Sequence, residues 1–184
     1  MNRISEILFF LKKGSTILYP TDTVWGVGCD ATNEEAVKKV YKLKNREESK
    51  SLIILVDSIE MLQNYIENIP EKAFEILKTS DKPTTIIYNS PKGLAPNTIA
   101  VDNTIAIRIP KDEFCIQLIR EFGKPIVSTS ANVSGEPTPK SFLEISEEIK
   151  QNVDFVVKVN IDKVSTKAST ILKIEKGSII TIRK

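Results

Sequence analysis

This chain contains both short apolar runs typical of β-strands and amphipathic patterns typical of helices. The strand-like runs are clustered toward its two ends. The predicted strands cover 16–19, 24–29, 52–56, 84–88, 104–110, 125–127, 155–159, 170–174 and 179–183. The predicted helices cover 3–13, 33–43, 58–66, 70–78, 112–122 and 141–150. This order of elements favours an α/β or α+β fold in which helices flank one large mixed sheet. The last two strands are expected to form a hairpin.

Two helix boundaries are marked by capping patterns. Asp112 is expected to cap a helix that Gly123 closes, because an aspartate accepts hydrogen bonds from the first turn and glycine tolerates the left-handed conformation at the end. Ser141 and Glu144 have the spacing of a capping box, which predicts a helix from there through about Lys150.

Length and composition bound the class of protein. A chain of 184 residues suits a single domain over residues 1–184, with 41% hydrophobic and 27% charged residues as in ordinary globular proteins. The two cysteines, Cys29 and Cys115, lie in apolar stretches and do not resemble a disulfide framework, so a reducing cytoplasm is expected. The sequence shows no signal-peptide pattern and no apolar run near the roughly 18 residues of a membrane span, so no membrane contact is expected.

Histidine is absent, which excludes a histidine-based catalytic triad and histidine-ligated zinc. Two lone cysteines cannot make a structural zinc site either. Gly26 and Gly28 favour close backbone approach within a strand, but they lack the spacing of a dinucleotide fingerprint. An enzyme with this composition is expected to work by positioning and electrostatics.

Hydroxyl side chains are concentrated where the strand-like run at 125–127 leaves the core. The segment 124–139 carries Ser128, Thr129, Ser130, Asn132 and Ser134, and two further hydroxyl-bearing loops lie at 19–23 and 165–170. Hydroxyl donors on an irregular backbone suit the binding of an oxyanion. Taken alone, the first segment is explained equally well as a polar turn after an edge strand.

Basic residues accompany these loops. Lys44, Arg46 and Lys50 place three cations within seven residues, a pattern usual for a solvated helix end that also leaves a phosphate-facing role open. Arg108 lies in an otherwise apolar run and is either paired with a carboxylate, which the sequence slightly favours, or directed at a ligand. With Arg183 and the hydroxyl-bearing loops, these cations indicate a polyphosphate or nucleotide ligand bound without a Walker loop.

Four motifs follow one another along nearly the whole chain. They are Tyr19-Pro20-Thr21-Asp22-Thr23-Val24-Trp25-Gly26-Val27-Gly28-Cys29-Asp30-Ala31, Lys44-Asn45-Arg46, Ala106-Ile107-Arg108-Ile109-Pro110 and Ser128-Thr129-Ser130-Ala131-Asn132-Val133-Ser134-Gly135. In this order and spacing they resemble the YrdC family of threonylcarbamoyl-AMP synthases, in its short form. Members make the activated intermediate for the threonylcarbamoyladenosine modification of tRNA.

The resemblance implies a fold and a set of site residues. It implies a twisted, largely antiparallel sheet around a wide, positively charged cavity. Residues expected around L-threonine are Thr23, Arg108, Ser128 and Ser169. Residues expected to face ATP are Arg46, Lys50, Thr104, Ser130, Thr138 and Arg183. The catalytic residues implied are Lys44, Arg46, Ser130 and Asn132.

The chemistry implied by the resemblance joins three substrates. Threonine's amine reacts with bicarbonate or carbon dioxide, and the resulting carbamate attacks the α-phosphorus of ATP with loss of pyrophosphate. Cations, hydroxyl donors and magnesium held mainly by the phosphates would stabilise the growing charge, with no metal site on the protein. The product would pass to the downstream tRNA threonylcarbamoyl-transfer complex, with tRNA or other RNA as a candidate contact.

Three positions depart from the family pattern as the resemblance presents it. Glu47 follows the Lys-x-Arg pair where many members carry proline. Lys50 and Leu55 stand where long-form members often carry asparagine and a threonine-contacting histidine. These departures make the threonine pocket less closely matched to the family than the nucleotide side.

Two other functions stay open from the sequence alone. One is a double-stranded RNA- or tRNA-binding module, although only 7% of residues are aromatic and the cations alternate with hydroxyls rather than with base-stacking rings. The other is a YrdC-like paralogue that hydrolyses its nucleotide.

Overall fold

A computed structural model describes residues 3–47, 52–164, 167–175 and 177–184. The strands are β1 (Ile17–Tyr19), β2 (Gly26–Gly28), β3 (Ile53–Leu55), β4 (Thr84–Asn89), β5 (Thr104–Arg108), β6 (Ile126–Ser130), β7 (Phe155–Val156), β8 (Thr170–Glu175) and β9 (Ser178–Arg183). The helices are α1 (Arg3–Lys12), α2 (Glu34–Leu43), α3 (Ile59–Tyr65), α4 (Glu71–Thr79), α5 (Glu113–Phe122) and α6 (Glu147–Asn152), with 3-10 turns η1 (Pro96–Thr98) and η2 (Phe142–Glu144).

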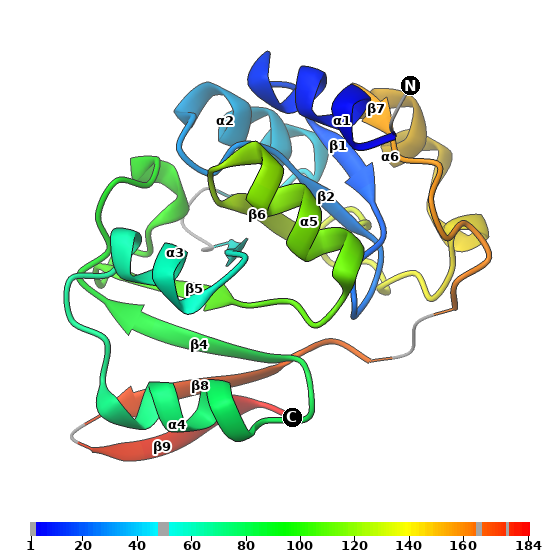
Figure 1. Ribbon diagram of the computed structural model, residues 1–184. Coiled ribbons are helices and arrows are strands. Elements are labelled where there is room, and N and C mark those ends of the chain that lie inside the picture. The colour runs from blue at the N-terminus through cyan, green and yellow to red at the C-terminus, as the bar shows by residue number, and fades with distance from the viewer. Residues whose placement is uncertain (1–2, 48–51, 165–166, 176) are drawn as a thin grey trace.

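Within these ranges the strands form one nine-stranded sheet in the order β7-β1-β2-β6-β3-β5-β4-β8-β9 (Figure 1). The pairs β1–β7, β3–β5 and β4–β8 are parallel, and the other neighbours are antiparallel. This confirms the predicted mixed α/β fold with a mostly antiparallel sheet. The predicted terminal hairpin is also confirmed, since β8 pairs with β9 across Gly177, whose φ is 76°.

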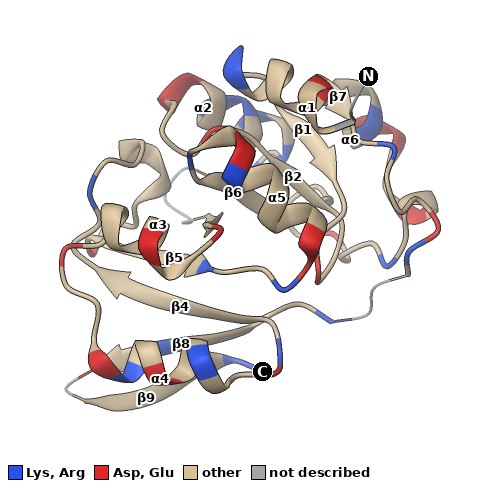
Figure 2. Cartoon of the chain, viewed as in Figure 1, with Lys and Arg blue, Asp and Glu red and all other residues tan. Residues whose placement is uncertain are grey.

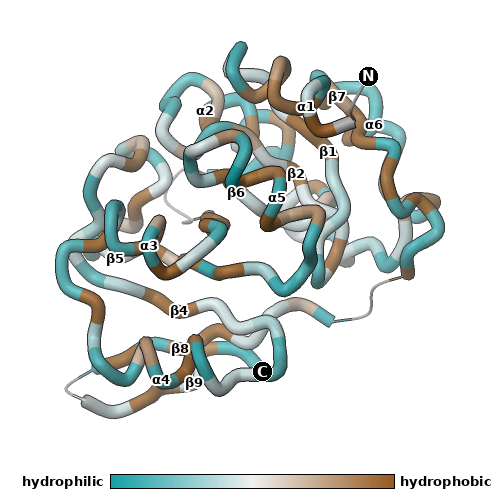
Figure 3. Tube along the Cα trace, viewed as in Figure 1, coloured by the Kyte–Doolittle hydropathy of each residue, from teal (hydrophilic) through white to brown (hydrophobic). Residues whose placement is uncertain are grey.

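Helices cover the two faces of the sheet with separate apolar clusters. Buried side chains of α1 and α5 pack with Tyr19, Leu55 and Ile126 on one face. Side chains of α2, α3, α4 and α6 pack with Val27, Ile54 and other strand residues on the second face. In Figure 3, hydrophobic and hydrophilic segments alternate along α5, as its amphipathic pattern requires. In the described part of the chain, no helix has both the length and the apolar character needed to cross a membrane.

The helix boundaries confirm one capping prediction and correct another. Asp112 accepts a hydrogen bond from the Cys115 amide (3.1 Å), and Gly123 ends α5 in the left-handed conformation, both as predicted. The Ser141 capping box is wrong, because the Ser141 side chain makes no capping bond and only the short turn η2 follows it.

The reason for this correction lies in the burial of Ile145. Its side chain is 2% exposed and its backbone is extended, which carries the chain out of the helical conformation before α6 begins. Ser146 is the N-cap instead and accepts a hydrogen bond from the Ile149 amide. Glu144 accepts from the Lys140 amide at 2.9 Å rather than completing the predicted box.

The two glycines of β2 allow the close approach that the sequence predicted. A Cβ added to Gly28 would lie 2.3 Å from the Val127 carbonyl oxygen and 2.8 Å from the Tyr19 ring. At Gly26 the nearest atom would be the Ser128 hydroxyl, at 3.2 Å. Glycine therefore lets β2 lie against β6 and under Tyr19, which brings the residues that flank β2 to the centre of the sheet.

Replacing Gly28 with alanine is expected to lower the free energy of unfolding by about 2–3 kcal/mol, because the methyl group overpacks against backbone that cannot move freely. Gly26→Ala is the matched control and should cost less, since only a hydroxyl has to shift there. Urea unfolding of the two variants measures the difference. Equal stability of Gly28→Ala and the parent protein would contradict this account of β2.

Candidate active site

A cavity of about 360 Å³ opens along the sheet, with lining residues from every strand between β2 and β9 in the sheet order. It is lined by Thr23, Val24, Gly26, Arg46, Leu52, Ile53, Ile87, Ala106, Arg108, Ser128, Thr129, Ser130, Thr138, Ala168, Ser169, Ile171, Ile182 and Arg183. Residues from distant parts of the sequence therefore meet around one space because the sheet order interleaves early, middle and late strands.

Most of the site residues predicted from the sequence lie on this wall. They are Thr23, Arg46, Arg108, Ser128, Ser130, Thr138, Ser169 and Arg183. Three further predicted residues lie outside the lining of the cavity: Lys44, Thr104 and Asn132. Lys50, Ser165 and Thr166 lie outside the described residues.

The register of β6 places its hydroxyl groups on the cavity side. Ser128 pairs with Ile53 of β3, and Ser130 pairs with Gly26 of β2. Side chains two positions apart in a strand point to the same face, so Ser128 and Ser130 both line the cavity. The oxyanion-binding interpretation of this segment is thereby favoured over a simple polar turn.

Arg108 combines the two roles that the sequence left as alternatives. Its side chain is 3% exposed and forms a buried ion pair through Nη1 with Asp22. Nη2 donates to the Thr23 hydroxyl at 3.3 Å, and the buried Nε has no hydrogen-bond partner among the residues that the structure describes. The guanidinium lines the cavity as well, so the carboxylate partner orients it while one donor stays unsatisfied.

Asp22 is a site residue that the sequence analysis did not select. Besides pairing with Arg108, it accepts a hydrogen bond from the Lys111 amide through Oδ2 at 3.0 Å. It thus connects the loop after β1 to the segment after β5. Its place inside the Pro-Thr-Asp-Thr motif was the available signal, but no sequence feature showed that its partner is Arg108.

A β-bulge turns the end of β9 toward the cavity. Ile171 pairs with Arg183 whereas Leu172 pairs with Thr181, which leaves Ile182 as an extra residue in β9. Bulges redirect side chains in this way. As a result, both Ile182 and Arg183 line the cavity.

Arg183 is anchored on Ser169 and faces the charge of Arg108. Its Nε and Nη2 donate to the Ser169 carbonyl at 3.0 and 2.9 Å, and the Ser169 hydroxyl lies 2.7 Å from that of Thr85. Burial lowers the pKa of Arg183, and the positive charge of Arg108 lowers it further. An anion in the cavity would favour the charged form of Arg183.

Lys44 holds the loop after β6 from behind rather than facing the cavity. Its side chain is 1% exposed, and its Nζ donates to the carbonyls of Ser130 and, at 2.5 Å, Asn132. Its own carbonyl accepts from the Ser134 amide at 2.8 Å. Burial, with a smaller contribution from the charge of Arg46, lowers the pKa of Lys44 to about 8.

This lowered pKa predicts a pH dependence of stability. Between pH 8 and 10.5 unfolded Lys44 binds more protons than folded Lys44, so its contribution to the unfolding free energy rises with pH in that window. The total rise is about 3 kcal/mol, and below pH 8 Lys44 adds no slope. Lys44→Met should lack this rise. Urea unfolding of both proteins at several pH values from 7.5 to 10.5 gives the unfolding free energy of each as a function of pH. If the two free energies changed with pH in the same way, the lowered pKa of Lys44 would be contradicted.

Asn132 and Thr104, the other two predicted site residues outside the cavity lining, make hydrogen bonds to residues near them in the sequence. Asn132 donates through Nδ2 to the carbonyls of Val133 (3.0 Å) and Glu136 (2.7 Å), which shapes its own loop. The Thr104 hydroxyl donates to Asp102 at 2.6 Å, and this bond is the main cause of the lowered pKa of Asp102. Their assigned roles in catalysis and ATP binding stay predictions.

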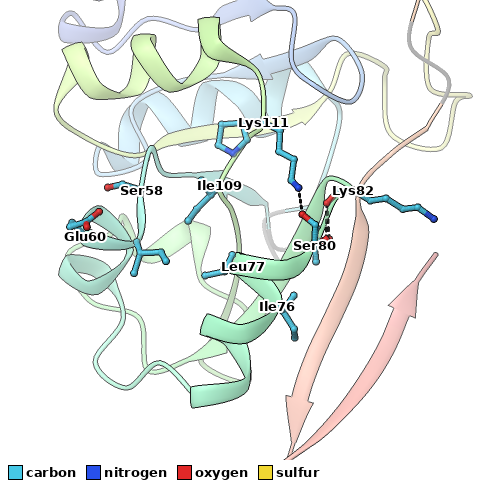
Figure 4. A pocket seen from close by; sticks show the side chains of 11 residues that line it. Ser58, Glu60, Ile76, Leu77, Ser80, Lys82, Ile109 and Lys111 are labelled. Atoms are coloured by element: carbon cyan, nitrogen blue, oxygen red, sulfur yellow. Dashed lines mark hydrogen bonds between the residues drawn. The ribbon is translucent and has the colours of Figure 1, made fainter.

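A second hollow between α3 and α4 is not the candidate site. Figure 4 shows Ile76, Leu77 and Ile109 around it, with Ser58 and Glu60 at one side and Lys111 bonded to Ser80 at the other. The predicted site residues are absent from its lining. Among the residues that the structure describes, its lining includes Lys82 and Lys111 but no arginine, and Lys111 donates to the Ser80 carbonyl.

Comparison with known proteins agrees with this geometry. The Sua5/YciO/YrdC family model, described as "Telomere recombination", matches residues 10–184. A Methanocaldococcus jannaschii protein named "Putative threonylcarbamoyl-AMP synthase" is 38% identical, over 97% of this chain and 86% of that protein. The Bacillus subtilis threonylcarbamoyl-AMP synthase is 33% identical over 84% of this chain, but the match spans only 45% of the relative.

The solved structure of Pyrococcus abyssi Sua5 complexed with L-threonine superposes with a TM-score of 0.88 and 29% identity, over 98% of this chain and 53% of that one. The Escherichia coli YciO structure, at 21% identity and a TM-score of 0.86, shows the same fold. With the family model covering nearly the whole sequence, the chain belongs to the Sua5/YciO/YrdC family.

Proposed function

We propose that this protein synthesises L-threonylcarbamoyladenylate from L-threonine, bicarbonate and ATP, with release of pyrophosphate. The observation that carries the proposal is one cavity in which Arg108 and Arg183 meet the hydroxyls of Thr23, Ser128 and Ser169. The names of relatives support it, since the Bacillus subtilis protein is named threonylcarbamoyl-AMP synthase and the Methanocaldococcus jannaschii protein carries the same name as a putative one.

L-Threonine would occupy the side of the cavity near Arg108. There the guanidinium, oriented by Asp22, would receive the substrate carboxylate. Thr23, Ser128 and Ser169 would surround the rest of the amino acid. Sua5 has been solved with L-threonine on the same fold, which supports this assignment.

ATP would occupy the side that carries Arg46, Ser130, Thr138 and Arg183. Lys50 and Thr104 complete the nucleotide set that we propose. Magnesium would enter on the phosphates of ATP, whose oxygens are the ligands that it prefers. Lys44 and Asn132 would act by shaping the loop that presents Ser130.

In this arrangement the protein contributes position and charge. Holding a carbamate and the α-phosphorus in line replaces a rare encounter by an oriented one, an effect worth roughly 7–11 kcal/mol in favourable intramolecular systems. Arg46 and Arg183 would stabilise the negative charge that grows on the phosphoryl oxygens. The hydroxyl donors would hold the reacting groups without needing a histidine.

We place this activity in a single domain over residues 1–184 in the cytoplasm, with the downstream tRNA threonylcarbamoyl-transfer complex as the consumer of the product. The two cysteines are free and buried, which fits a reducing compartment. Direct contact with tRNA is part of the same proposal, because the product is used on tRNA.

The test is pyrophosphate release from ATP and bicarbonate with L-threonine, with L-serine, with L-alanine and with no amino acid. We expect release that depends on threonine. Release of equal rate without an amino acid would indicate a nucleotide-hydrolysing paralogue. No turnover by folded protein in the presence of magnesium would favour the RNA-binding module.

A further inference from the structure

A larger chamber of about 900 Å³ adjoins the cavity of the candidate site. It is lined by Asp22, Thr23, Lys82, Pro83, Lys163, Val164, Lys167, Ala168, Thr170 and Lys184. Thr23 and Ala168 line both spaces, so the two share a wall. The chamber lies on the Thr23 side, whereas Arg46 and Thr138 line only the other cavity.

The wall of this chamber carries four lysine side chains and one carboxylate side chain. The carboxylate, Asp22, is already compensated by Arg108 and by the Lys111 amide. Lys163 pairs with Asp112 at 3.6 Å and donates to the Thr21 carbonyl at 2.9 Å, which ties its segment to the Thr23 loop. Its positive charge is therefore compensated as well.

The other three lysines, Lys82, Lys167 and Lys184, have no hydrogen bond or ion pair through their side chains in the described part of the chain. Figure 2 shows basic segments close together at the start of β4, before β8 and at the C-terminus. In Figure 4 the Lys82 side chain extends away from the apolar residues of the hollow beside α4. A concave wall with uncompensated cations concentrates small anions from solution.

We propose that this chamber binds and delivers bicarbonate to the amine of threonine. The proposal rests on the synthase function above. Of the three substrates, bicarbonate is the anion that must reach the threonine side, and the nucleotide would fill the cavity on the side of Arg46 and Thr138. This step forms the carbamate of threonine. The amine nitrogen bonds to the bicarbonate carbon while one C–O bond of bicarbonate breaks. The departing oxygen leaves as water, with one proton from the amine and one from bicarbonate.

The test is the KM for bicarbonate in the full-length chain with Lys82→Gln and Lys167→Gln combined, at saturating ATP and threonine. We expect an increase of roughly threefold to tenfold, and a larger one when both lysines become glutamate. The KM values for ATP and threonine should change less than about twofold. Added salt should raise the bicarbonate KM of the parent protein and have less effect on the glutamine variant, because salt screens exposed charges.

Lys12→Gln combined with Lys42→Gln is the matched control, since these exposed lysines lie on α1 and α2, outside the chamber lining. An unchanged bicarbonate KM in the chamber variants overturns the proposal, and so does an increase confined to the KM for ATP, which would make the chamber a route for the nucleotide. Loss of threonine dependence in the parent protein would instead overturn the synthase function itself. Circular dichroism of each variant confirms that it is folded.

Discussion

Arg108→Ala is expected to reduce threonine-dependent pyrophosphate release by about 100-fold or more, mainly through a higher KM for threonine. Removing one partner of a buried, hydrogen-bonded charge pair costs about 2–5 kcal/mol, and here that partner is also the cation proposed to receive the substrate carboxylate. The single variant also leaves Asp22 buried without its ion pair, which should lower the unfolding free energy by about 3–5 kcal/mol.

A double variant separates these two effects. Arg108→Ala combined with Asp22→Asn no longer contains an uncompensated buried charge, so much of the lost stability should return. Activity should not return, because the cation for the carboxylate is still missing. Steady-state kinetics at increasing threonine concentration and urea unfolding on the same preparations provide both readouts. A double variant with the KM for threonine of the parent protein would show that Arg108 only holds the fold together.

Lys44→Met is the second change with a large expected effect. The variant keeps the length of the buried side chain but loses both hydrogen bonds to the Ser130 and Asn132 carbonyls. Hydrogen bonds from a charged group contribute about 1.5–3 kcal/mol each, so the loop that presents Ser130 should lose its fixed position. We expect kcat/KM for ATP to fall by about 100-fold, which corresponds to about 2.7 kcal/mol.

Lys42→Met is the control for this experiment, because Lys42 is exposed and lies two residues earlier, in the last turn of α2. It should keep the activity of the parent protein. Pyrophosphate release at several ATP concentrations gives the comparison. If Lys44→Met turned over like its control, the loop would hold its shape without the lysine, and the catalytic role proposed for Lys44 would have to be abandoned.

The sequence alone was sufficient for the mixed α/β class and for most element positions. Periodicity located α5 and its caps, because each signal there is local: Asp112 needs only the amide of Cys115 three residues on. The Ser141 capping box failed for a physical reason of the opposite kind. Its local pattern was correct, but burying Ile145 in the core stabilised an extended residue over a continuous helix.

The sequence likewise predicted one part of the candidate site and left another part open. Motif order predicted the candidate site residues, and eight of them line one cavity, because the sheet order brings strands and loops from distant parts of the sequence around the same space. The sequence left the partner of Arg108 open, since Asp22 lies 86 positions away. It likewise assigned Lys44 a direct role without indicating that the amine bonds to two carbonyls of the loop after β6.

The amino-acid sequence defines the chemistry available to this protein: hydroxyls, guanidinium groups and amines, with histidine excluded. Its periodicity determined the elements that carry them. Which cation is paired, which is buried and which faces a cavity depends on the packing of the folded chain, as Arg108, Lys44 and Lys82 show. The reason is that charge interactions depend on distance and on exclusion of water, and both are set by strands that lie far apart in the sequence and side by side in the sheet.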